Sequence, residues 1–201
     1  MFDSDVIKQG IKDESILDVM REVDRGNFVP KKYADLAYED RAISIGEGQT
    51  ISQPFIVAFM TENLKLKPEH NILEVGTGSG FQTAVLSKLV ASVVSIEINE
   101  VLAKKASILL NELNYKKISF HCGDGNHGIP EHAPYDRILV AAASNEVPEK
   151  LVDQLAINGK MIIPIGKQAE VQHLWLITKN DDGKINKEKI LPVHFVPLLN
   201  G

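Results

Sequence analysis

Cysteine is almost absent from this chain, which has only Cys122 among its 201 residues. A single cysteine cannot form an intrachain disulfide, so we expect a reducing, cytoplasmic compartment. Long apolar runs are missing as well. The longest, residues 138–143, is far shorter than the ~18 residues that suggest a membrane-spanning helix. Residues 1–5 are acidic, whereas a secretory signal begins with basic residues. We therefore predict a cytoplasmic protein with no membrane partner.

Basic residues are fewer than acidic ones. Lys and Arg number 22 against 27 Asp and Glu, which gives a formal net charge of −5, and no run of Lys or Arg forms a basic patch. Because a general nucleic-acid binder needs the opposite balance, we expect no nucleic-acid partner. Hydrophobic residues make up 44% and charged residues 24%, which is ordinary globular composition. The length fits one domain of about 100–200 residues.

Several catalytic signatures are also absent. The sequence has no Gly-x-Ser-x-Gly elbow, no phosphate loop ending in Gly-Lys-Ser/Thr and no His-Glu-x-x-His. The histidines near Cys122 do not have the spacing of a structural zinc site, so we predict no metal. Cys122 could pair with a histidine as a nucleophile, but a lone cysteine on a buried strand is more often inert packing.

From residue 71 onwards, short apolar strands alternate with amphipathic helices. The predicted strands cover residues 71–75, 93–98, 118–122, 135–142, 160–165, 173–178 and 190–196, and the helices cover 81–90, 100–114 and 148–156. This alternation is typical of a mostly parallel sheet with both faces covered. The turn signal Asn180-Asp181-Asp182-Gly183 predicts an antiparallel hairpin at the end. We therefore predict a doubly wound α/β fold.

The first third of the chain has a helical pattern instead. Ile16, Leu17, Met20 and Val23 recur at helical spacing. We expect Asp13 to cap this helix and Gly26 to end it. A second amphipathic helix, residues 56–64, follows a predicted loop bracketed by Gly46, Gly48 and Pro54. Within a single domain, we predict an N-terminal helical cap on the substrate side, residues 1–66, and a cofactor-binding α/β core, residues 67–201.

A glycine-rich turn, Glu74-Val75-Gly76-Thr77-Gly78-Ser79-Gly80, joins the first predicted strand of the core to its helix. Ligands of doubly wound folds bind beyond the carboxyl ends of the strands. Glycines let the backbone approach a ligand closely, and the helix start offers free N–H groups. Glu97 ends the next strand, about 20 residues on, where an acidic side chain reaches a ribose diol. A nucleotide-like ligand is favoured over a turn that only packs a helix.

The spacing of this turn distinguishes between nucleotide ligands. A dinucleotide site has Gly-x-Gly-x-x-Gly, whereas this Gly-x-Gly-x-Gly, preceded by Glu74, resembles the first motif of class I S-adenosylmethionine methyltransferases. The resemblance implies S-adenosyl-L-methionine as the cofactor and a Rossmann-like methyltransferase sheet. It assigns Gly76, Thr77, Gly78 and Glu97 to cofactor binding, with Glu74 near the ammonium group. It also places Asp124 and Gly125, after the third strand, at the adenine.

The segment after the fourth predicted strand, residues 143–148, reads Ala-Ser-Asn-Glu-Val-Pro. Amino-methylating DNA enzymes have an Asn/Asp-Pro-Pro-aromatic motif there, so its absence argues against methylation of an exocyclic amine. A carboxylate acceptor, with a pKa near 4, is already ionised at neutral pH. Such an acceptor needs orientation and desolvation rather than a strong base.

The string Gly46-Glu47-Gly48-Gln49-Thr50-Ile51-Ser52-Gln53-Pro54 predicts a loop with Ser52 as the N-cap of the next helix. It also resembles the signature of protein-L-isoaspartate O-methyltransferases. Residues 25–30, 38–40, 73–80, 123–125 and 195–198 resemble further motifs of that family, in the same order and across nearly the whole chain.

The resemblance implies methyl transfer from S-adenosyl-L-methionine to the free α-carboxylate of an L-isoaspartyl residue, leaving S-adenosyl-L-homocysteine. The ester then collapses to a succinimide, which returns partly to aspartate. Ser52 falls on the active-site serine, and Thr50 and Ile51 line the reactive end of the cofactor. The partners are isoaspartyl proteins and peptides, and we expect a monomer. The chain departs from the family pattern at Ser44, where proline is usual, and at Ala141, where threonine is usual.

Two alternative hypotheses stay open. One is a methyltransferase of the same fold acting on another carboxylate or a small molecule, which the missing threonine hydroxyl at Ala141 would permit. The other is a non-catalytic S-adenosylmethionine-binding paralogue. Ser52 argues against the second, because a pure binder does not need the whole Gly-Gln-Thr-Ile-Ser string. A nicotinamide-dependent oxidoreductase is disfavoured by the glycine spacing.

Overall fold

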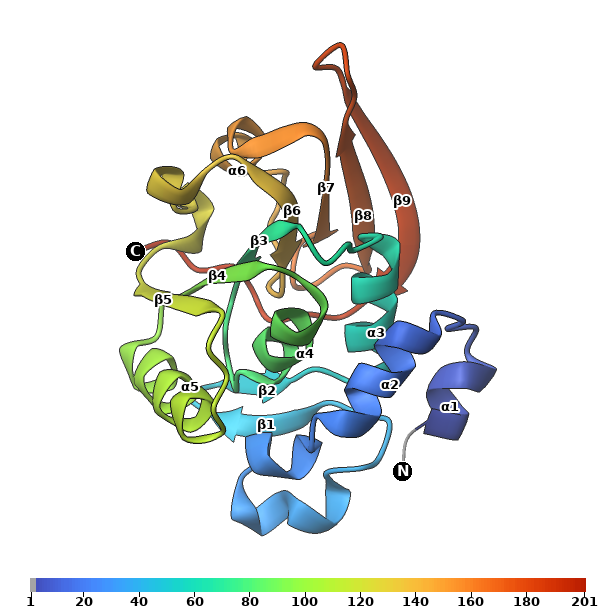
Figure 1. The fold of residues 1–201 in the computed structure, drawn as a ribbon, viewed down its shortest axis with the longest axis vertical. Coiled ribbons are helices and arrows are strands. Elements are labelled where there is room, and N and C mark those ends of the chain that lie inside the picture. Colours follow the sequence, from blue (N-terminus) through green and yellow to red (C-terminus); the bar gives the residue numbers. More distant parts are fainter. Residues whose placement is uncertain (1–2) are drawn as a thin grey trace.

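A seven-stranded sheet forms the centre of the molecule (Figure 1). The computed structural model describes residues 3–201, so Met1 and Phe2, the start of the predicted N-terminal segment, lie outside the described residues. The strand order is β5-β4-β3-β6-β7-β8-β9. The strands are β3 (Asn71–Val75), β4 (Ser92–Glu97), β5 (Ile118–Cys122), β6 (Tyr135–Val140), β7 (Leu155–Ile165), β8 (Gln172–Lys179) and β9 (Ile185–Val193).

The first five of these strands are parallel, and β8 and β9 are antiparallel. The chain builds outward from β3 in one direction through β4 and β5, and then returns to the other side of β3 as β6. This reversal makes the carboxyl ends of β3 and β6 the switch point at which ligands bind in such sheets. The predicted doubly wound fold with a terminal antiparallel hairpin is confirmed. Figure 1 shows β8 and β9 extending beyond the other strands.

Helices cover both faces of the sheet. The core helices are α4 (Phe81–Leu89), α5 (Glu100–Glu112) and α6 (Glu149–Asp153). The side chain of Asn99 caps α5 by accepting from the amides of Val101 and Leu102, as predicted. On one face of β3, Leu73 packs in a core that includes Leu151 of α6. On the other face, Ile72 shares a core with residues of α3 (Pro54–Asn63) and α4.

The N-terminal segment packs against α4. It contains α1 (Asp3–Lys8), α2 (Glu14–Glu22) and two 3₁₀ helices, η1 (Arg25–Phe28) and η2 (Lys31–Leu36). Asp13 caps α2 as predicted, with its side chain accepting from the amide of Ser15. The predicted stop at Gly26 is wrong, because α2 ends at Glu22, where Val23 becomes extended. Gly26 lies inside η1, which Asp24 caps.

The predicted loop before α3 is a small antiparallel sheet of β1 (Ile43–Gly46) and β2 (Gln49–Ile51). Gly46, Glu47 and Gly48 all have positive φ, which allows the chain to turn back within two residues. The helical cap therefore carries a hairpin that brings residues 49–53 to the switch point of the large sheet. The remaining elements are the 3₁₀ helices η3 (Gly125–His127) and η4 (Pro130–His132).

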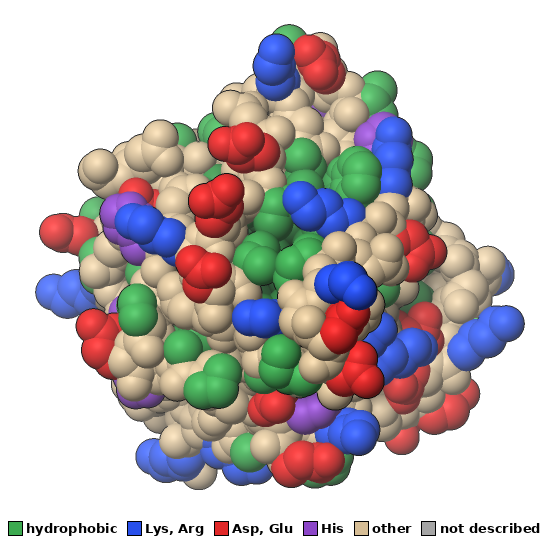
Figure 2. All heavy atoms as spheres, turned by 90° about the horizontal axis from the view of Figure 1, so that it is seen from above, with side chains coloured by type: hydrophobic (Ala, Val, Ile, Leu, Met, Phe, Trp, Pro, Cys, Tyr) green, Lys and Arg blue, Asp and Glu red, His purple; other side chains and the backbone are tan. Residues whose placement is uncertain are grey.

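The surface carries both signs of charge. Seen from the end at which the β8–β9 hairpin projects, acidic and basic side chains are interspersed around a hollow with a hydrophobic floor (Figure 2). Within residues 3–201, no helix has both the length and the apolar character needed to cross a bilayer.

Candidate active site

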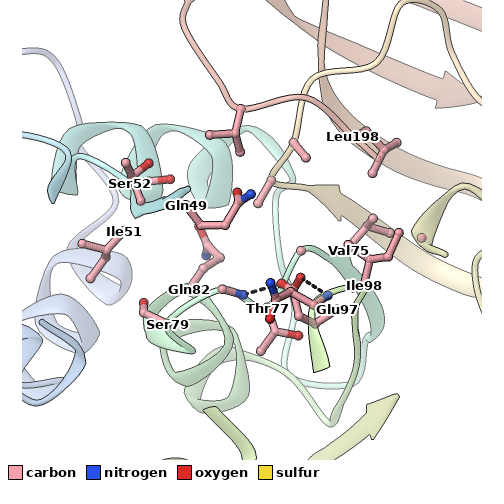
Figure 3. Close-up of a pocket in the computed structure, with 18 of the residues that line it drawn as sticks. Gln49, Ile51, Ser52, Val75, Thr77, Ser79, Gln82, Glu97, Ile98 and Leu198 are labelled. Carbon is pink, nitrogen blue, oxygen red and sulfur yellow. Dashed lines mark hydrogen bonds between the residues drawn. The ribbon is translucent and has the colours of Figure 1, made fainter. Parts of the chain in front are cut away.

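A cavity lies at the carboxyl ends of β3, β4 and β6, closed on one side by the β1–β2 hairpin (Figure 3). Eight of the ten predicted site residues line it, and two do not. The eight are Thr50, Ile51, Ser52, Gly76, Thr77, Gly78, Glu97 and Gly125. Segments that lie far apart in the sequence therefore meet at this one cavity.

Glu97 is fixed by two backbone donors. The Gly78 amide donates to Oε2 at 2.8 Å and the Asn99 amide donates to Oε1 at 2.9 Å. The side chain is only 7% exposed, and Figure 3 shows it at the floor of the cavity beside Thr77. An ionised carboxylate has about four acceptor positions, so this held carboxylate keeps capacity for donors of a ligand. The turn itself depends on the positive φ of Gly76, Gly78 and Gly80, which glycine tolerates best.

Glu74, which the sequence predicts to lie near the cofactor's ammonium group, does not line this cavity. Its side chain is fully buried on the α4 side of β3, where Oε2 accepts from the hydroxyls of Thr83 (2.5 Å) and Ser95 (2.6 Å). The Ser95 hydroxyl is in turn 2.6 Å from that of Thr77. Glu74 therefore contacts the glycine turn through Ser95 and Thr77.

Burial raises the pKa of Glu74 to about 7. The hydroxyls of Ser95 and Thr83 oppose the shift, and the charge of Glu97 adds to it. Among the described residues, Oε1 of Glu74 has no hydrogen-bond partner. The side chain thus combines a half-satisfied carboxyl group with a pKa close to neutrality.

Asp124 also lies outside the cavity lining. It caps η3, and its carboxylate accepts from the amide and side chain of Asn126 and from the Gly201 amide. Burial favours a higher pKa, but these hydrogen bonds outweigh it and hold the pKa of Asp124 below its usual value. The neighbouring Gly125 does line the cavity. A Cβ there would lie 2.3 Å from a methyl carbon of Val75, so no larger residue fits.

Ser52 lies where the first cavity meets a second one. The two cavities share Thr50, Ser52, Ala141 and Val196. The second cavity is otherwise lined by Ala42, Gln53, Ile56, Pro192, Val193, His194 and Phe195. Its walls come from the loop before β1, the start of α3 and the chain around the end of β9.

The prediction that Ser52 caps α3 is wrong. Gln53 is the N-cap residue and makes no side-chain cap bond. The free amide of Phe55 is satisfied instead by Asp40, whose Oδ1 accepts it at 2.8 Å. Within the described part of the chain, the Ser52 hydroxyl makes no hydrogen bond, so it is available to a bound molecule.

Some lining residues were missed from the sequence. Gln49, Gln82, Leu198 and Leu199 line the cofactor-side cavity. Gln49 and Leu198 lie in strings that the sequence singled out as family motifs, but neither was assigned to the site, and Gln82 and Leu199 lie in no such string. Cys122 is exposed, so its predicted burial is wrong. Across residues 3–201, no group of three or more His, Cys, Asp or Glu is arranged to hold a metal ion.

A parallel sheet with a reversal at β3, a Gly-x-Gly-x-Gly turn and an anchored acid at the end of β4 together define a class I S-adenosylmethionine-dependent methyltransferase fold. The family model of protein-L-isoaspartate(D-aspartate) O-methyltransferases matches residues 2–201. The chain belongs to this family. It is 46% identical over 198 residues to a protein-L-isoaspartate O-methyltransferase of Gloeobacter violaceus, covering 98% of this chain and 96% of the relative.

Solved structures agree with this assignment. One protein-L-isoaspartate O-methyltransferase superposes with a TM-score of 0.88 at 32% identity, covering 98% of this chain and 64% of the other. The chain thus spans somewhat less than two thirds of that protein. A Plasmodium falciparum protein of the same description, solved in complex with S-adenosyl-L-homocysteine, has a TM-score of 0.87 at 29% identity. That match covers 100% of this chain and 97% of the other.

Proposed function

We propose that this chain transfers a methyl group from S-adenosyl-L-methionine to the free α-carboxylate of L-isoaspartyl residues, and so starts the repair of aged proteins. The observation that carries this proposal is the position of Ser52 and Thr50. Both line the cavity built around the glycine turn and also the adjoining cavity. A donor and an acceptor can therefore meet at the Ser52 hydroxyl.

The cofactor-side cavity suits S-adenosyl-L-methionine. The held carboxylate of Glu97 is placed to accept from a ribose diol, and the open turn of Gly76 and Gly78 admits a ligand close to the backbone. Gly125 and Ile51 would complete the walls. Asp124, directly before Gly125, accepts three hydrogen bonds and so keeps about one acceptor position for the adenine amino group. When bound, the cofactor supplies a methyl group on a positively charged sulfur.

The second cavity suits a carboxylate acceptor. Among the described residues that line it, none is acidic and His194 alone has a titratable side chain. An isoaspartyl α-carboxylate is ionised at neutral pH and needs no base. The Ser52 hydroxyl can donate to one carboxylate oxygen and leave the other free to react. The N-terminus of α3, directly after Ser52 and Gln53, favours the negative charge.

The methyl ester then rearranges without further help from the chain. The backbone nitrogen of the next residue attacks the ester carbonyl, methanol leaves, and a succinimide forms. Water opens this ring partly to ordinary aspartate. A single domain, a monomer, a cytoplasmic location and the lack of a nucleic-acid or membrane partner stay predictions.

One assay tests the proposal. We expect the chain to transfer labelled methyl from S-adenosyl-L-methionine to a synthetic isoaspartyl peptide and not to its aspartyl twin. Transfer to neither peptide, with intact binding of S-adenosyl-L-homocysteine, would indicate a non-catalytic paralogue. Equal transfer to both would show a carboxylate methyltransferase that lacks isoaspartyl selectivity.

A further inference from the structure

We propose that Arg25 and Asp40 are positioning residues that together fix Ser52 against the cofactor-side cavity. The proposal rests on the function proposed above, and it assigns a positioning role to two residues of the N-terminal segment. Neither residue lines either cavity, so neither touches the reacting groups. Each acts through the segment 52–55.

Arg25 is a fully buried cation whose partners are backbone carbonyls. Its guanidinium donates to the carbonyls of Ala37, Arg41 (3.0 Å) and Ser52 (3.0 Å). Within residues 3–201, it forms no ion pair at salt-bridge distance. Burying this charge is costly and lowers the pKa of Arg25 to about 10, while the nearby negative charge of Asp40 opposes that shift. The three carbonyl acceptors offset the cost further, and they do so only while all three stay in place. The guanidinium therefore holds the Ser52 carbonyl to the loop around residues 37–41.

Asp40 holds the same segment from its amide side. Its Oδ1 accepts the Phe55 amide at 2.8 Å, and its Oδ2 accepts the Gln53 side chain at 2.7 Å. A third bond from Gln9 at 2.7 Å fixes the carboxylate to the N-terminal segment. Residues 52–55 thus have a carbonyl bound by Arg25 and an amide bound by Asp40, with the Ser52 side chain left free between them.

Arg25 also contacts the cofactor side. Its guanidinium carbon is 5.8 Å from the ring centroid of Phe81, the first residue of α4 after the glycine turn. Phe81 itself lines the cofactor-side cavity. One side chain therefore touches both the backbone of the acceptor-side serine and the helix that follows the cofactor turn. Misplacing reacting groups by about 1 Å can cost on the order of 100-fold in rate, which is why this spacing matters.

A role limited to folding is the competing explanation, and the chain offers a matched control. Arg137 is likewise buried, 7% exposed, and donates to backbone carbonyls, among them Leu64 at 2.6 Å and Lys65 at 3.3 Å. It lies near the start of β6, and it lines neither cavity. Replacing either arginine by lysine keeps the charge and removes the planar fork of donors.

The test compares Arg25→Lys, Arg137→Lys, Asp40→Asn and Asp40→Ala with the unaltered protein. Turnover of the isoaspartyl peptide is measured at saturating S-adenosyl-L-methionine, per site that binds S-adenosyl-L-homocysteine in calorimetry. We expect kcat of Arg25→Lys to fall roughly 10- to 100-fold, with affinity for S-adenosyl-L-homocysteine within about 3-fold. Arg137→Lys keeps its kcat. Asp40→Asn retains more activity than Asp40→Ala, because its amide oxygen still accepts the Phe55 amide.

An unchanged kcat per site in Arg25→Lys would overturn the proposal, even if that variant were less stable. If Arg25→Lys does not fold, the unchanged kcat of Asp40→Ala would do the same. If the unaltered protein methylates no isoaspartyl peptide, the proposed function fails. The positioning role of Arg25 and Asp40 is then tested separately by amide hydrogen exchange of residues 52–56. Faster exchange in Asp40→Ala and Arg25→Lys, but not in Arg137→Lys, supports the positioning role, and equal exchange in all of them refutes it.

Discussion

Two glutamates on adjacent strands show how the surroundings decide the role of a residue. Glu97 ends β4 with both carboxylate oxygens on backbone amides at the cavity floor. Glu74, one strand away, faces the α4 side and bonds only to hydroxyls. The sequence places both acids at strand ends beside the glycine turn, but it does not contain the facing of each side chain. The position of Glu97 at the cavity could therefore be predicted from its place at a strand end, whereas the burial of Glu74 could not.

The raised pKa of Glu74 predicts a pH-dependent stability. Below about pH 4.5 the carboxyl is protonated in the folded and unfolded chains alike, so stability is full. Between pH 4.5 and about 7 the unfolded chain loses this proton and the folded chain keeps it, so stability falls as pH rises. We expect Glu74→Gln to lack this fall, which is on the order of 3 kcal/mol. Urea unfolding of both proteins at pH 5 and pH 8 measures it, and parallel pH profiles would contradict it.

Ser52 should matter for turnover and not for stability. Since Asp40 rather than Ser52 satisfies the start of α3, we expect Ser52→Ala to unfold at the same urea concentration as the unaltered protein. Loss of one donor that orients the acceptor should lower kcat on an isoaspartyl peptide roughly 10- to 1,000-fold. Ser52→Asp should fold and bind cofactor, yet be nearly inactive, because it repels the acceptor carboxylate. Full activity of Ser52→Asp would move the orienting role to backbone amides of this segment.

At the scale of elements, the β1–β2 hairpin was the feature least accessible from sequence. Its strands are four and three residues long. Ile43, Ser44 and Ile45 alternate apolar and polar side chains, but so short a run does not distinguish a strand from a loop. Strands β3, β4 and β6 were found because each is a buried apolar run between turn residues. Strand β9 has no buried residue, and the predicted range 190–196 overlaps only its last four residues. The Asp40 cap was missed for a different reason: its helix begins 14 residues later, and sequence patterns detect local caps only.

The start of α4 gives a test of how tightly elements pack. Gly80 has a φ of +88°, and a Cβ there would lie 2.9 Å from a methyl carbon of Leu110 in α5. Gly183 has a φ of +78° with no atom near its Cβ position. We expect Gly183→Ala to cost about 1 kcal/mol of unfolding free energy through backbone strain alone. Gly80→Ala should cost about 1–3 kcal/mol more through overpacking. If thermal unfolding gave the same loss of stability for both variants, α5 would have to move away from the added methyl group at no cost.

At the scale of the whole molecule, ligand binding should stabilise every element that borders the cofactor-side cavity. At a concentration 100 times its dissociation constant, S-adenosyl-L-homocysteine should add about 2.7 kcal/mol of stability. For a domain of this size that raises Tm by roughly 5–10 °C. Glu97→Ala should lose most of this shift at the same concentration, because a hydrogen-bonded charge contributes roughly 1.5–3 kcal/mol. A comparable shift with NAD would contradict the cofactor assignment.

The sequence predicts the parallel strands of the large sheet and the antiparallel hairpin that follows them. Alternation of strand and helix from residue 71 implies parallel strands, and the turn at 180–183 implies a closing hairpin. What composition cannot give is where residues after β9 go. In the structure they pass across the switch point and so complete both cavities. The Ala143 amide donates to the Val196 carbonyl, and the Leu198 amide donates to the Ala143 carbonyl. That path is determined by contacts between residues far apart in the sequence, and no local sequence pattern predicts such contacts.

This late return of the chain has a consequence for synthesis. A ribosome that has translated as far as residue 184 has already made the glycine turn, Glu97 and Ser52, but not the segment 192–199 that walls both cavities. The growing polypeptide can thus form most of its parallel sheet while its cavities are still open to solvent on that side. Catalytic competence therefore requires that segment 192–199 has been made and folded, so nascent chains and truncated products that lack it would be inactive toward damaged proteins.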